Sequence, residues 1–419
     1  MNKLSILMVL LLLIPLSGIS QTRLTLNECR DLSRENFPKM KQVEVLNKIA
    51  ELKNRNTQSN YLPQIDLKGQ ATYQSDVIEI NLPIPNFSFD PVSKDQYKMY
   101  LDVKQTIWDG GMTKSKKELE LAGLESDVQK LEIEIQQVYT MVDAYFFGNL
   151  MADNNLKVLQ AQQAVLESQI QKLGSAISLG AAREKEKLKL EMENLLMDQK
   201  MMALSSQKRS FLEMLGILTG QSLDENTNLI VPENLNKQTE QLRPELKYFN
   251  LQTLELNSGD KLLKATRNPL FFGFGQAGYG KPGFNMLSNE FAPYYIVGLG
   301  LNWRVIDWKN SQRNREINIQ NRAMIATLQN DFLQKQALQK VDAAEKINNL
   351  KELIQTDEKM VIGRKAIAES ASAELLNGII TSTDYLIDLN AQTVAQINLE
   401  MHKIQLIQAI VNYNSILGY

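Results

Sequence analysis

Few side chains in this chain of 419 residues could perform catalysis or bind a metal. It contains one cysteine, Cys29, and one histidine, His402. A metal site built from several His and Cys ligands is therefore excluded, as is a Cys–His or Ser–His catalytic pair unless His402 serves it. The sequence has no glycine-rich phosphate loop, HExxH or GxSxG motif. We expect no enzyme and no cofactor, and we interpret His402 as inert on a polar helix face and Cys29 as an ordinary helix residue.

The net charge and the N-terminal residues also indicate which classes of protein to expect. The net charge of −2 gives no field that would attract nucleic acid. Residues 1–20 combine Lys3, an apolar run over 4–16 and a small-residue site at Gly18-Ile19-Ser20. This pattern predicts a cleaved secretory signal peptide, with a retained anchor as the alternative. After residue 20 no stretch approaches 18 apolar residues, so no transmembrane helix is predicted.

One layout occurs twice in the sequence, at an offset of 198 positions. An alternating strand over 97–104 runs into Asp109, and a similar strand over 295–302 runs into Asp307. Each continues into a proline-free tract that glycine interrupts, at Gly180 and at Gly378. Two landmarks in one register indicate duplication of a whole unit. We predict a first repeat over 21–216, a linker over 217–241 and a second repeat over 242–419.

The proline-free tracts favour long helices. They are rich in Leu, Ala, Gln, Glu, Lys and Met, and apolar residues from Leu121 to Tyr145 follow an unbroken 3-4 spacing typical of a coiled-coil seam. We predict helical hairpins over about 112–216 and 309–417. In the first, one helix should end at Leu173, followed by a glycine-marked turn and a return helix from Arg183 to Gly216. We expect the alternating charges of 183–187 to form a solvated face, and shorter helices over 22–56 and 242–267.

The segments before the long helices read as β-hairpins, over about 63–108 and 269–306. Apolar and polar residues alternate along them, which is the pattern of a membrane barrel wall. The first hairpin tip holds Pro83, Pro85 and Pro91. Four strands cannot close a barrel, because the smallest single-chain barrels use about eight. The barrel must therefore be shared between chains, and the long helices also need neighbours.

Aromatic residues stand near both ends of these strands, as in the girdles of an outer-membrane protein. Tyr97 to Trp108 spans about 28 Å along the membrane normal at a tilt of ~40°, close to the apolar band of about 25 Å. The alternative is that these rings fill a soluble sheet. The predicted membrane-interface aromatics are Trp108, Trp303, Trp308, Tyr97, Tyr294 and Tyr295.

Several short segments resemble the TolC family of outer-membrane efflux proteins, and the resemblance extends over essentially the whole chain after residue 20. Their order, spacing and duplication carry the resemblance, since no single segment is diagnostic. The segments are Leu24-Thr25-Leu26-Asn27-Glu28-Cys29, Tyr61-Leu62-Pro63-Gln64, Ile107-Trp108-Asp109-Gly110-Gly111, the run from Asn377 to Leu386, and the run from Tyr413 to Gly418.

The resemblance implies a mainly α fold with a membrane β-barrel part: a homotrimer with a 12-stranded barrel, a long periplasmic tunnel of helices and an equatorial belt that includes the linker. It implies a Gram-negative outer membrane, contact with its lipid, a periplasmic adaptor (membrane fusion) protein and an inner-membrane RND or ABC transporter. The expected function is a passive, porin-like conduit for small molecules such as drugs, metals or metabolites. Alternatives are the outer-membrane component of type I protein secretion and a structural coiled-coil envelope protein.

The family closes its periplasmic end with helical hairpins and, in some members, a ring of aspartates. Asp384 matches the first acidic position, Ile387 stands where a second acid would fall, and Asp388 is adjacent. The family's gating arginine and tyrosine fall on Ile380 and Leu375. The resemblance therefore implies a periplasmic gate with at most one acidic layer. The alternative is that Asp384 only favours its helix N-terminus.

The turns between the paired helices are the expected contacts with the adaptor. The resemblance places these adaptor-docking residues at Gly180, Gly378 and Thr381. The simpler interpretation is that the two glycines only cap their helices, which their conformational freedom favours in any case.

Overall fold

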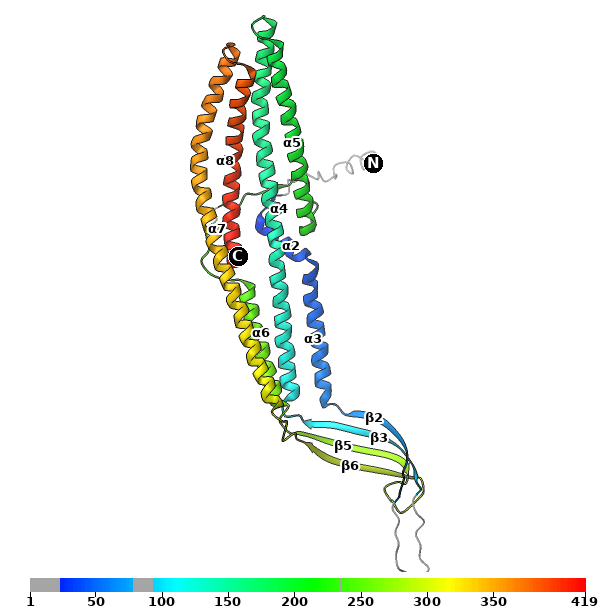
Figure 1. Ribbon diagram of the computed structural model, residues 1–419. Helices are drawn as coiled ribbons and strands as arrows, with labels where there is room; N and C mark the ends of the chain where they lie inside the picture. Colours follow the sequence, from blue (N-terminus) through cyan, green and yellow to red (C-terminus); the bar gives the residue numbers. More distant parts are fainter. Residues whose placement is uncertain (1–22, 78–92, 234–235) are drawn as a thin grey trace, which may run out of the picture. The chain divides into compact units, whose positions relative to one another are not determined.

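The computed structural model describes residues 23–77, 93–233 and 236–419 (Figure 1). The predicted signal peptide and the three prolines of the first hairpin tip lie outside these residues. The described chain forms two compact units. Of the described residues, the first unit is drawn from 23–40, 131–233, 236–244 and 333–419, and the second comprises 41–77, 93–130 and 245–332. No helix in the described ranges is long and apolar enough to cross a membrane.

Four long helices occur as two equivalent pairs. Helices α4 (Met112–Ser178) and α7 (Asn310–Leu376) each have 67 residues, and α5 (Glu184–Thr219) and α8 (Ser382–Leu417) each have 36. Equivalent helices begin and end 198 positions apart, the offset found in the sequence. The equal lengths of α4 and α7 follow from equivalent start and stop signals in the two copies.

The start signal of α4 and of α7 is an aspartate that caps the helix. The Thr113 main-chain N–H donates to Asp109 Oδ2 (2.7 Å), and the Ser311 main-chain N–H donates to Asp307 Oδ2 (3.0 Å). These bonds satisfy amide groups that have no partner within the helix. Burial raises the pKa of Asp109, but hydrogen bonds from Thr113, Tyr61 and Gly111 outweigh it, so that the pKa lies below its ordinary value.

The stop signal is a glycine in the left-handed region, where side chains with a Cβ are strained. Gly180 has φ 78° and Gly378 has φ 69°. Past each glycine the chain bonds back to the helix, from Ala181 N–H to Ala176 O (2.8 Å) and from Ile379 N–H to Glu374 O (2.9 Å). Both turns are therefore built alike.

Two predicted boundaries were wrong. Helix α4 passes through Gly174 and ends at Ser178, because one glycine inside a packed helix costs only about 1 kcal/mol. The segment over 22–56 is not one helix but is divided at Pro38, whose nitrogen carries no hydrogen to donate. It forms α2 (Leu26–Asn36), the 3-10 helix η1 (Pro38–Lys41) and α3 (Gln42–Gln58), followed by η2 (Ser59–Tyr61). In the second copy α6 (Pro244–Ala265) is continuous.

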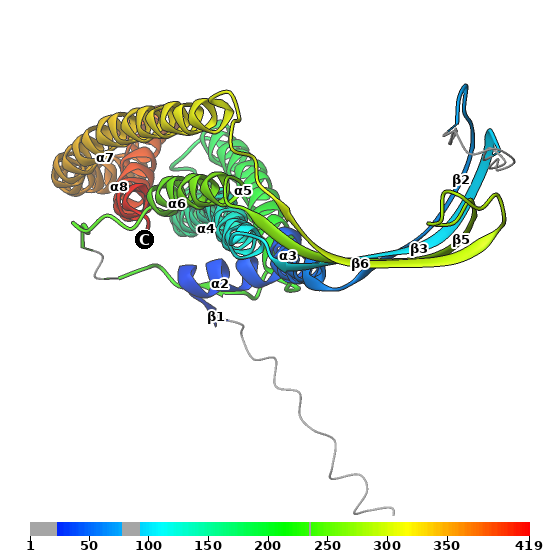
Figure 2. The same cartoon turned by 90° about the horizontal axis from the view of Figure 1, so that it is seen from below.

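The second unit contains a curved sheet of four antiparallel strands, which Figure 2 shows from below. The strands are β2 (Gln64–Tyr73), β3 (Asp95–Trp108), β5 (Leu270–Lys281) and β6 (Ala292–Asn302), in the order β2-β3-β5-β6. The two predicted hairpins are thus joined through the β3–β5 pair. In the first unit, the two-residue strands β1 (Arg23–Leu24) and β4 (Asn228–Leu229) pair in parallel.

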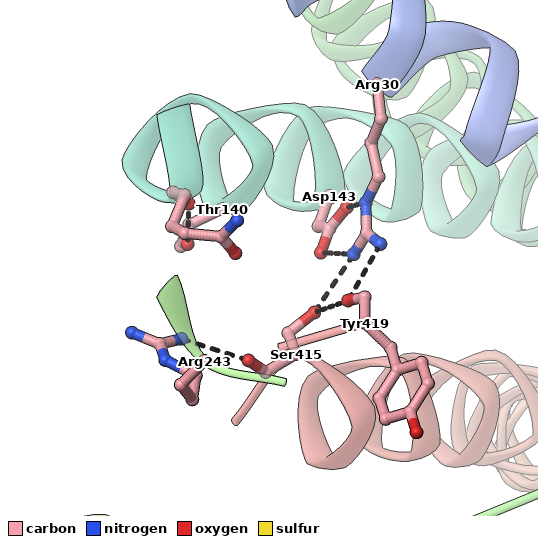
Figure 3. A network of polar contacts seen from close by, with 7 residues as sticks. Arg30, Thr140, Asp143, Arg243, Ser415 and Tyr419 are labelled. Atoms are coloured by element: carbon pink, nitrogen blue, oxygen red, sulfur yellow. Dashed lines mark hydrogen bonds and ion pairs between the residues drawn. The ribbon is translucent and has the colours of Figure 1, made fainter. Parts of the chain in front are cut away.

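The core of the first unit packs α2 against the long helices. Cys29 and Phe146 have no exposed surface, and both belong to one apolar cluster with Leu215. Next to it, Arg30 donates to both carboxylate oxygens of Asp143 (2.9 and 2.6 Å) and to Ser415 Oγ (3.0 Å), as Figure 3 shows. Burial raises the pKa of Asp143 even though Arg30 opposes the shift. This network ties α2 to α4 and to the end of α8.

Candidate functional sites: the hairpin turns and the sheet

The starts of α5 and α8 are joined directly by hydrogen bonds. The Ser382 main-chain N–H donates to Glu186 Oε2 (2.9 Å), and Lys189 Nζ donates to Thr383 Oγ1 (2.9 Å) and to Glu186 (3.4 Å). The bond from Ser382, assisted by Lys189, holds the pKa of Glu186 below its ordinary value. We call these four residues the hairpin latch. They connect the α4–α5 hairpin to the α7–α8 hairpin, a contact that no local sequence pattern predicts.

Asp384 acts as a helix cap in this structure. Its Oδ2 accepts hydrogen bonds from the Thr381 main-chain N–H (3.0 Å) and hydroxyl (2.7 Å), while the Asp384 N–H donates back to Thr381 Oγ1 (3.3 Å). This reciprocal arrangement is a capping box. The hydrogen bonds from Thr381 lower the pKa of Asp384, so its carboxylate stays charged. Ile387, one turn further, is 63% exposed.

Both turns present apolar side chains to their surroundings. Leu179 is 85% exposed and Ile379 is 70% exposed, each beside its turn glycine. A Cβ added at Gly180 or Gly378 would meet no atom within 4 Å, so the turns have open space around them. Behind the second turn Tyr385 is almost wholly buried, and burial raises its pKa to about 12. Both hairpin ends therefore expose an apolar side chain, and the second end also has a buried tyrosine behind its turn.

The two faces of the sheet differ in chemistry. Successive residues of a strand point to opposite sides, and the register places Leu67, Leu101, Ala277 and Tyr295 in one row. This face, here called the aliphatic face, exposes Val297 (79%) and Leu299 (81%) among others. The opposite, charged face carries the ionisable residues of the strand interiors: Asp66, Lys68, Lys98, Asp102 and Lys104.

The predicted tryptophans lie at or beyond one end of the sheet. Trp108 contacts Phe271 at one end (ring centroids 5.8 Å apart), where Trp303 also follows β6. Trp303 Nε1 donates to Arg267 O (3.1 Å), and Trp308 is 83% exposed.

At the other end Tyr97 stacks with Phe291 (6.4 Å). Tyr295 lies on the aliphatic face, but its neighbour Tyr294 lies on the charged face and packs beside Tyr100 (6.5 Å). These two tyrosines therefore cannot both face the same surroundings.

His402, which we interpret from the sequence as inert on a polar helix face, is paired with Asp357 in the structure. Its Nδ1 lies 2.6 Å from Asp357 Oδ2, and the two side chains are 19% and 11% exposed. The pair joins α7 to α8 between two apolar clusters, one around Leu375 and Leu389 and the other around Ile347 and Tyr413. Nothing in the local sequence of either residue predicted this contact, because the partners are 45 positions apart.

Comparisons with known proteins identify the fold. No family model and no curated protein matches the chain. Among solved structures, it is similar to the CmeC outer membrane channel of Campylobacter jejuni (16% identity, TM-score 0.64, covering 94% of this chain and 85% of that one). It is also similar to the outer membrane protein VceC of Vibrio cholerae (13%, 0.65, 94% and 96%) and to CusC, whose structures describe transmembrane channel formation (12%, 0.69, 94% and 92%). The chain therefore has the fold of outer-membrane channels, and the resemblance to the TolC family is confirmed at the level of the fold.

Proposed function

We propose that this chain is the outer-membrane channel of a tripartite export system in a Gram-negative bacterium. It would act as a passive homotrimeric conduit that carries small molecules from a periplasmic adaptor and an inner-membrane RND or ABC transporter to the exterior. The observation that carries the proposal is the sheet, which has an exposed aliphatic face, a charged face and two open edges. Likeness of fold to outer-membrane channels supports it.

The open edges argue for a shared barrel. Within the described residues β2 and β6 each pair with one neighbour only, so each leaves a row of main-chain groups unpaired. In lipid such groups must find partners, because no water is present to bond them. Pairing the β6 edge of one copy with the β2 edge of the next would satisfy both edges. Three copies of four strands give the 12-stranded barrel of the proposed trimer.

Exposed apolar residues on α5 support the same assembly. Leu188, Met192, Leu195 and Met202 are each more than half exposed and follow a helical spacing along one side. A stripe of this kind is typical of a helix that packs on another helix. In the proposed trimer it would be covered by helices of a neighbouring copy, which together form the periplasmic tunnel. The two repeats would then contribute equivalent parts of the wall.

Membrane extraction and conductance test the conduit. We expect the protein to stay in outer-membrane fractions after a salt wash, to run as a heat-modifiable trimer, and to form channels in planar lipid bilayers. Release by the salt wash alone would favour the structural coiled-coil alternative and overturn the proposal. Trimers without conductance would also contradict it. Export of a reporter protein instead of small molecules in a reconstituted system would favour type I secretion.

The gate remains part of the proposal, with Asp384, Ile387 and Asp388 near the constriction. Asp384→Ala should weaken block of the current by divalent cations, since a ring of carboxylates attracts cations. It also removes half of the capping box. Thr381→Ala is therefore the matched control, because it removes the cap but keeps the carboxylate. Equal loss of block in both variants would mean that Asp384 only caps its helix.

We propose that the adaptor docks at the hairpin turns around Gly180, Gly378 and Thr381. Substitution of the exposed apolar residues beside the two glycines tests this. Leu179→Ser and Ile379→Ser should reduce co-purification of the adaptor while trimers still assemble. Ile217→Ser is a suitable control, because Ile217 is 76% exposed but lies near the C-terminus of α5, away from its turn. Unchanged adaptor capture by both tip variants would exclude docking at these turns.

A further inference from the structure

The charged face of the sheet carries a group of aromatic rings that the alternating pattern does not require. Tyr100, Phe272, Phe274 and Tyr294 all belong to this face by register. Phe272 and Phe274 neighbour each other on β5 (ring centroids 6.3 Å apart), and Tyr100 neighbours Tyr294 across the sheet (6.5 Å). If the chain is the proposed conduit, this face lines the lumen, where polar side chains are the norm. Four large aromatic rings on such a face are therefore unexpected.

Glycines on β6 leave room for the two phenylalanine rings. Gly298 and Gly300 on β6 stand opposite Phe274 and Phe272 in the register. A Cβ added at Gly298 would lie 2.6 Å from Phe274 Cζ, and one at Gly300 would lie 2.3 Å from Phe272 Cζ. Each ring therefore occupies the space above a glycine. The two ring planes are inclined to each other by 47°, and the Lys104 ammonium lies over the Phe272 ring. A flat ligand ring can therefore stack on Phe274 but not on both phenylalanines at once.

Charge around these rings favours an anion. Lys104 Nζ lies 4.3 Å from the centre of the Phe272 ring, within cation–π distance. In the described part of the chain Lys104 makes no hydrogen bond or ion pair, whereas Asp102 already accepts bonds from Lys68 and from Gln276 (3.0 Å). Lys104 and Asp102 attract each other, but the Asp102 carboxylate is already bonded by Lys68 and Gln276, so the Lys104 ammonium keeps N–H donors for a ligand.

We propose that Phe272, Phe274 and Lys104 form a binding strip in the lumen for planar aromatic compounds that carry a carboxylate or a similar anionic group. The ligand's ring would stack on Phe274, and its anionic group would pair with the Lys104 ammonium, which lies over Phe272. The inference rests on the proposed function, because only a conduit gives this face a lumen. It names a substrate class for that conduit.

Current block in planar bilayers tests the strip, with 2-naphthoate as the probe. Wild-type channels should be blocked by 2-naphthoate at lower concentration than by cyclohexanecarboxylate, which has the charge but no flat ring, or by 2-naphthylmethylammonium, which has the ring but the opposite charge. Phe274→Leu should raise the half-blocking concentration about tenfold, as expected from the loss of one stacking contact. Phe272→Leu should also raise it, because it removes the ring beneath the Lys104 ammonium. Lys104→Gln should raise it similarly and should not disturb the glycine-packed rings.

The matched control is Phe271→Leu, since Phe271 is the next residue of the same strand but lies on the aliphatic face. It should leave the block unchanged. Trimer bands before and after heating check assembly of every variant. If both channels conduct normally and 2-naphthoate blocks wild type and Lys104→Gln at the same concentration, the proposed binding strip is wrong. The proposed conduit is not affected by that result. Stronger block by the ammonium probe would also overturn the strip. Wild-type trimers without conductance would instead refute the proposed function, and the strip with it.

Discussion

Glu186 and Ser382, 196 positions apart in the sequence, are joined by a hydrogen bond of 2.9 Å from the Ser382 main-chain N–H to the Glu186 carboxylate. A carboxylate near a helix N-terminus is favourable, and here the helix belongs to the other hairpin. Sequence duplication makes Glu186 the counterpart of Asp384, yet the two acids differ in role. Asp384 caps its own helix α8, whereas Glu186 binds the start of that same helix from outside. The copies have therefore diverged at equivalent positions.

The latch predicts an effect of Lys189 on channel opening. Lys189→Met removes the bonds to Thr383 and Glu186, worth about 1 kcal/mol for a partly exposed charge, and should increase the time-averaged conductance in bilayers. Lys187→Met serves as the control, because Lys187 pairs along its own helix with Glu191 (3.2 Å) and, among the described residues, with no group of the other hairpin. If both variants conduct like the wild type, the hydrogen bonds of Lys189 do not restrain opening.

The capping box predicts a pH dependence at the start of α8. The folded-state pKa of Asp384 is below its ordinary value, so the cap stabilises the helix above that ordinary value. Its contribution is lost as pH falls through the lower, folded-state value. Amides of 381–385 should exchange more slowly in wild type than in Asp384→Asn at pH 6, and this difference should shrink below roughly pH 4. A difference that persists unchanged at pH 2 would contradict the role of the carboxylate.

Thr381→Ala should weaken the same helix start by about 1 kcal/mol, a typical value for loss of an N-cap side chain. Hydrogen exchange of the amides of 381–385 measures this as a faster rate. Thr356→Ala is the control, since that hydroxyl only bonds back to Glu352 O within α7 (3.1 Å). Equal exchange rates at 381–385 in both variants would show that the Thr381 hydroxyl is dispensable.

The glycine-packed rings predict a double-mutant effect. Gly300→Ala places a methyl group in the space of the Phe272 ring, and such overpacking typically costs about 1–3 kcal/mol. The temperature at which trimers dissociate should fall, and Phe272→Ala in the same chain should restore part of it. Gly275→Ala should have little effect, because its added Cβ would meet nothing closer than 3.8 Å. Additive effects of Gly300→Ala and Phe272→Ala would show that the two positions do not interact.

The buried pair predicts that His402 matters for stability. His402→Leu leaves the Asp357 carboxylate without its partner in a mostly buried position, at a cost of roughly 2–3 kcal/mol. The dissociation temperature of the trimer should therefore fall. The double variant with Asp357→Leu should recover it, because two packed leucines suit the surrounding apolar seam. A double variant less stable than His402→Leu alone would contradict this account.

The sequence predicted helices and turns better than side-chain contacts, for a physical reason. Helix starts and stops depend on short-range signals, such as Asp109 before α4 and Gly378 after α7, and these can be recognised from spacing alone. The latch and the His402–Asp357 pair join residues of different helices. Their contacts depend on the packing register of those helices, which no local pattern specifies. The predicted end of the first long helix before Gly174 was wrong for a related reason. Packing along the helix outweighed the weak tendency of a single glycine to end it.

Unequal helix lengths constrain how such a chain can change in size. Helix α4 is longer than its hairpin partner α5, and within the second unit α3 accompanies it instead, for example through Lys53 and Glu120 (2.9 Å). In that unit α6 accompanies α7 in the same way, through Asp260 and Arg322 (2.9 Å). Inserting one residue into a long helix would rotate everything beyond it by about 100° and break these pairings. Lengthening is therefore tolerated only in steps of about seven residues, made together in partnered helices. Descendants of one ancestral gene should differ in length by such matched increments, present in both copies.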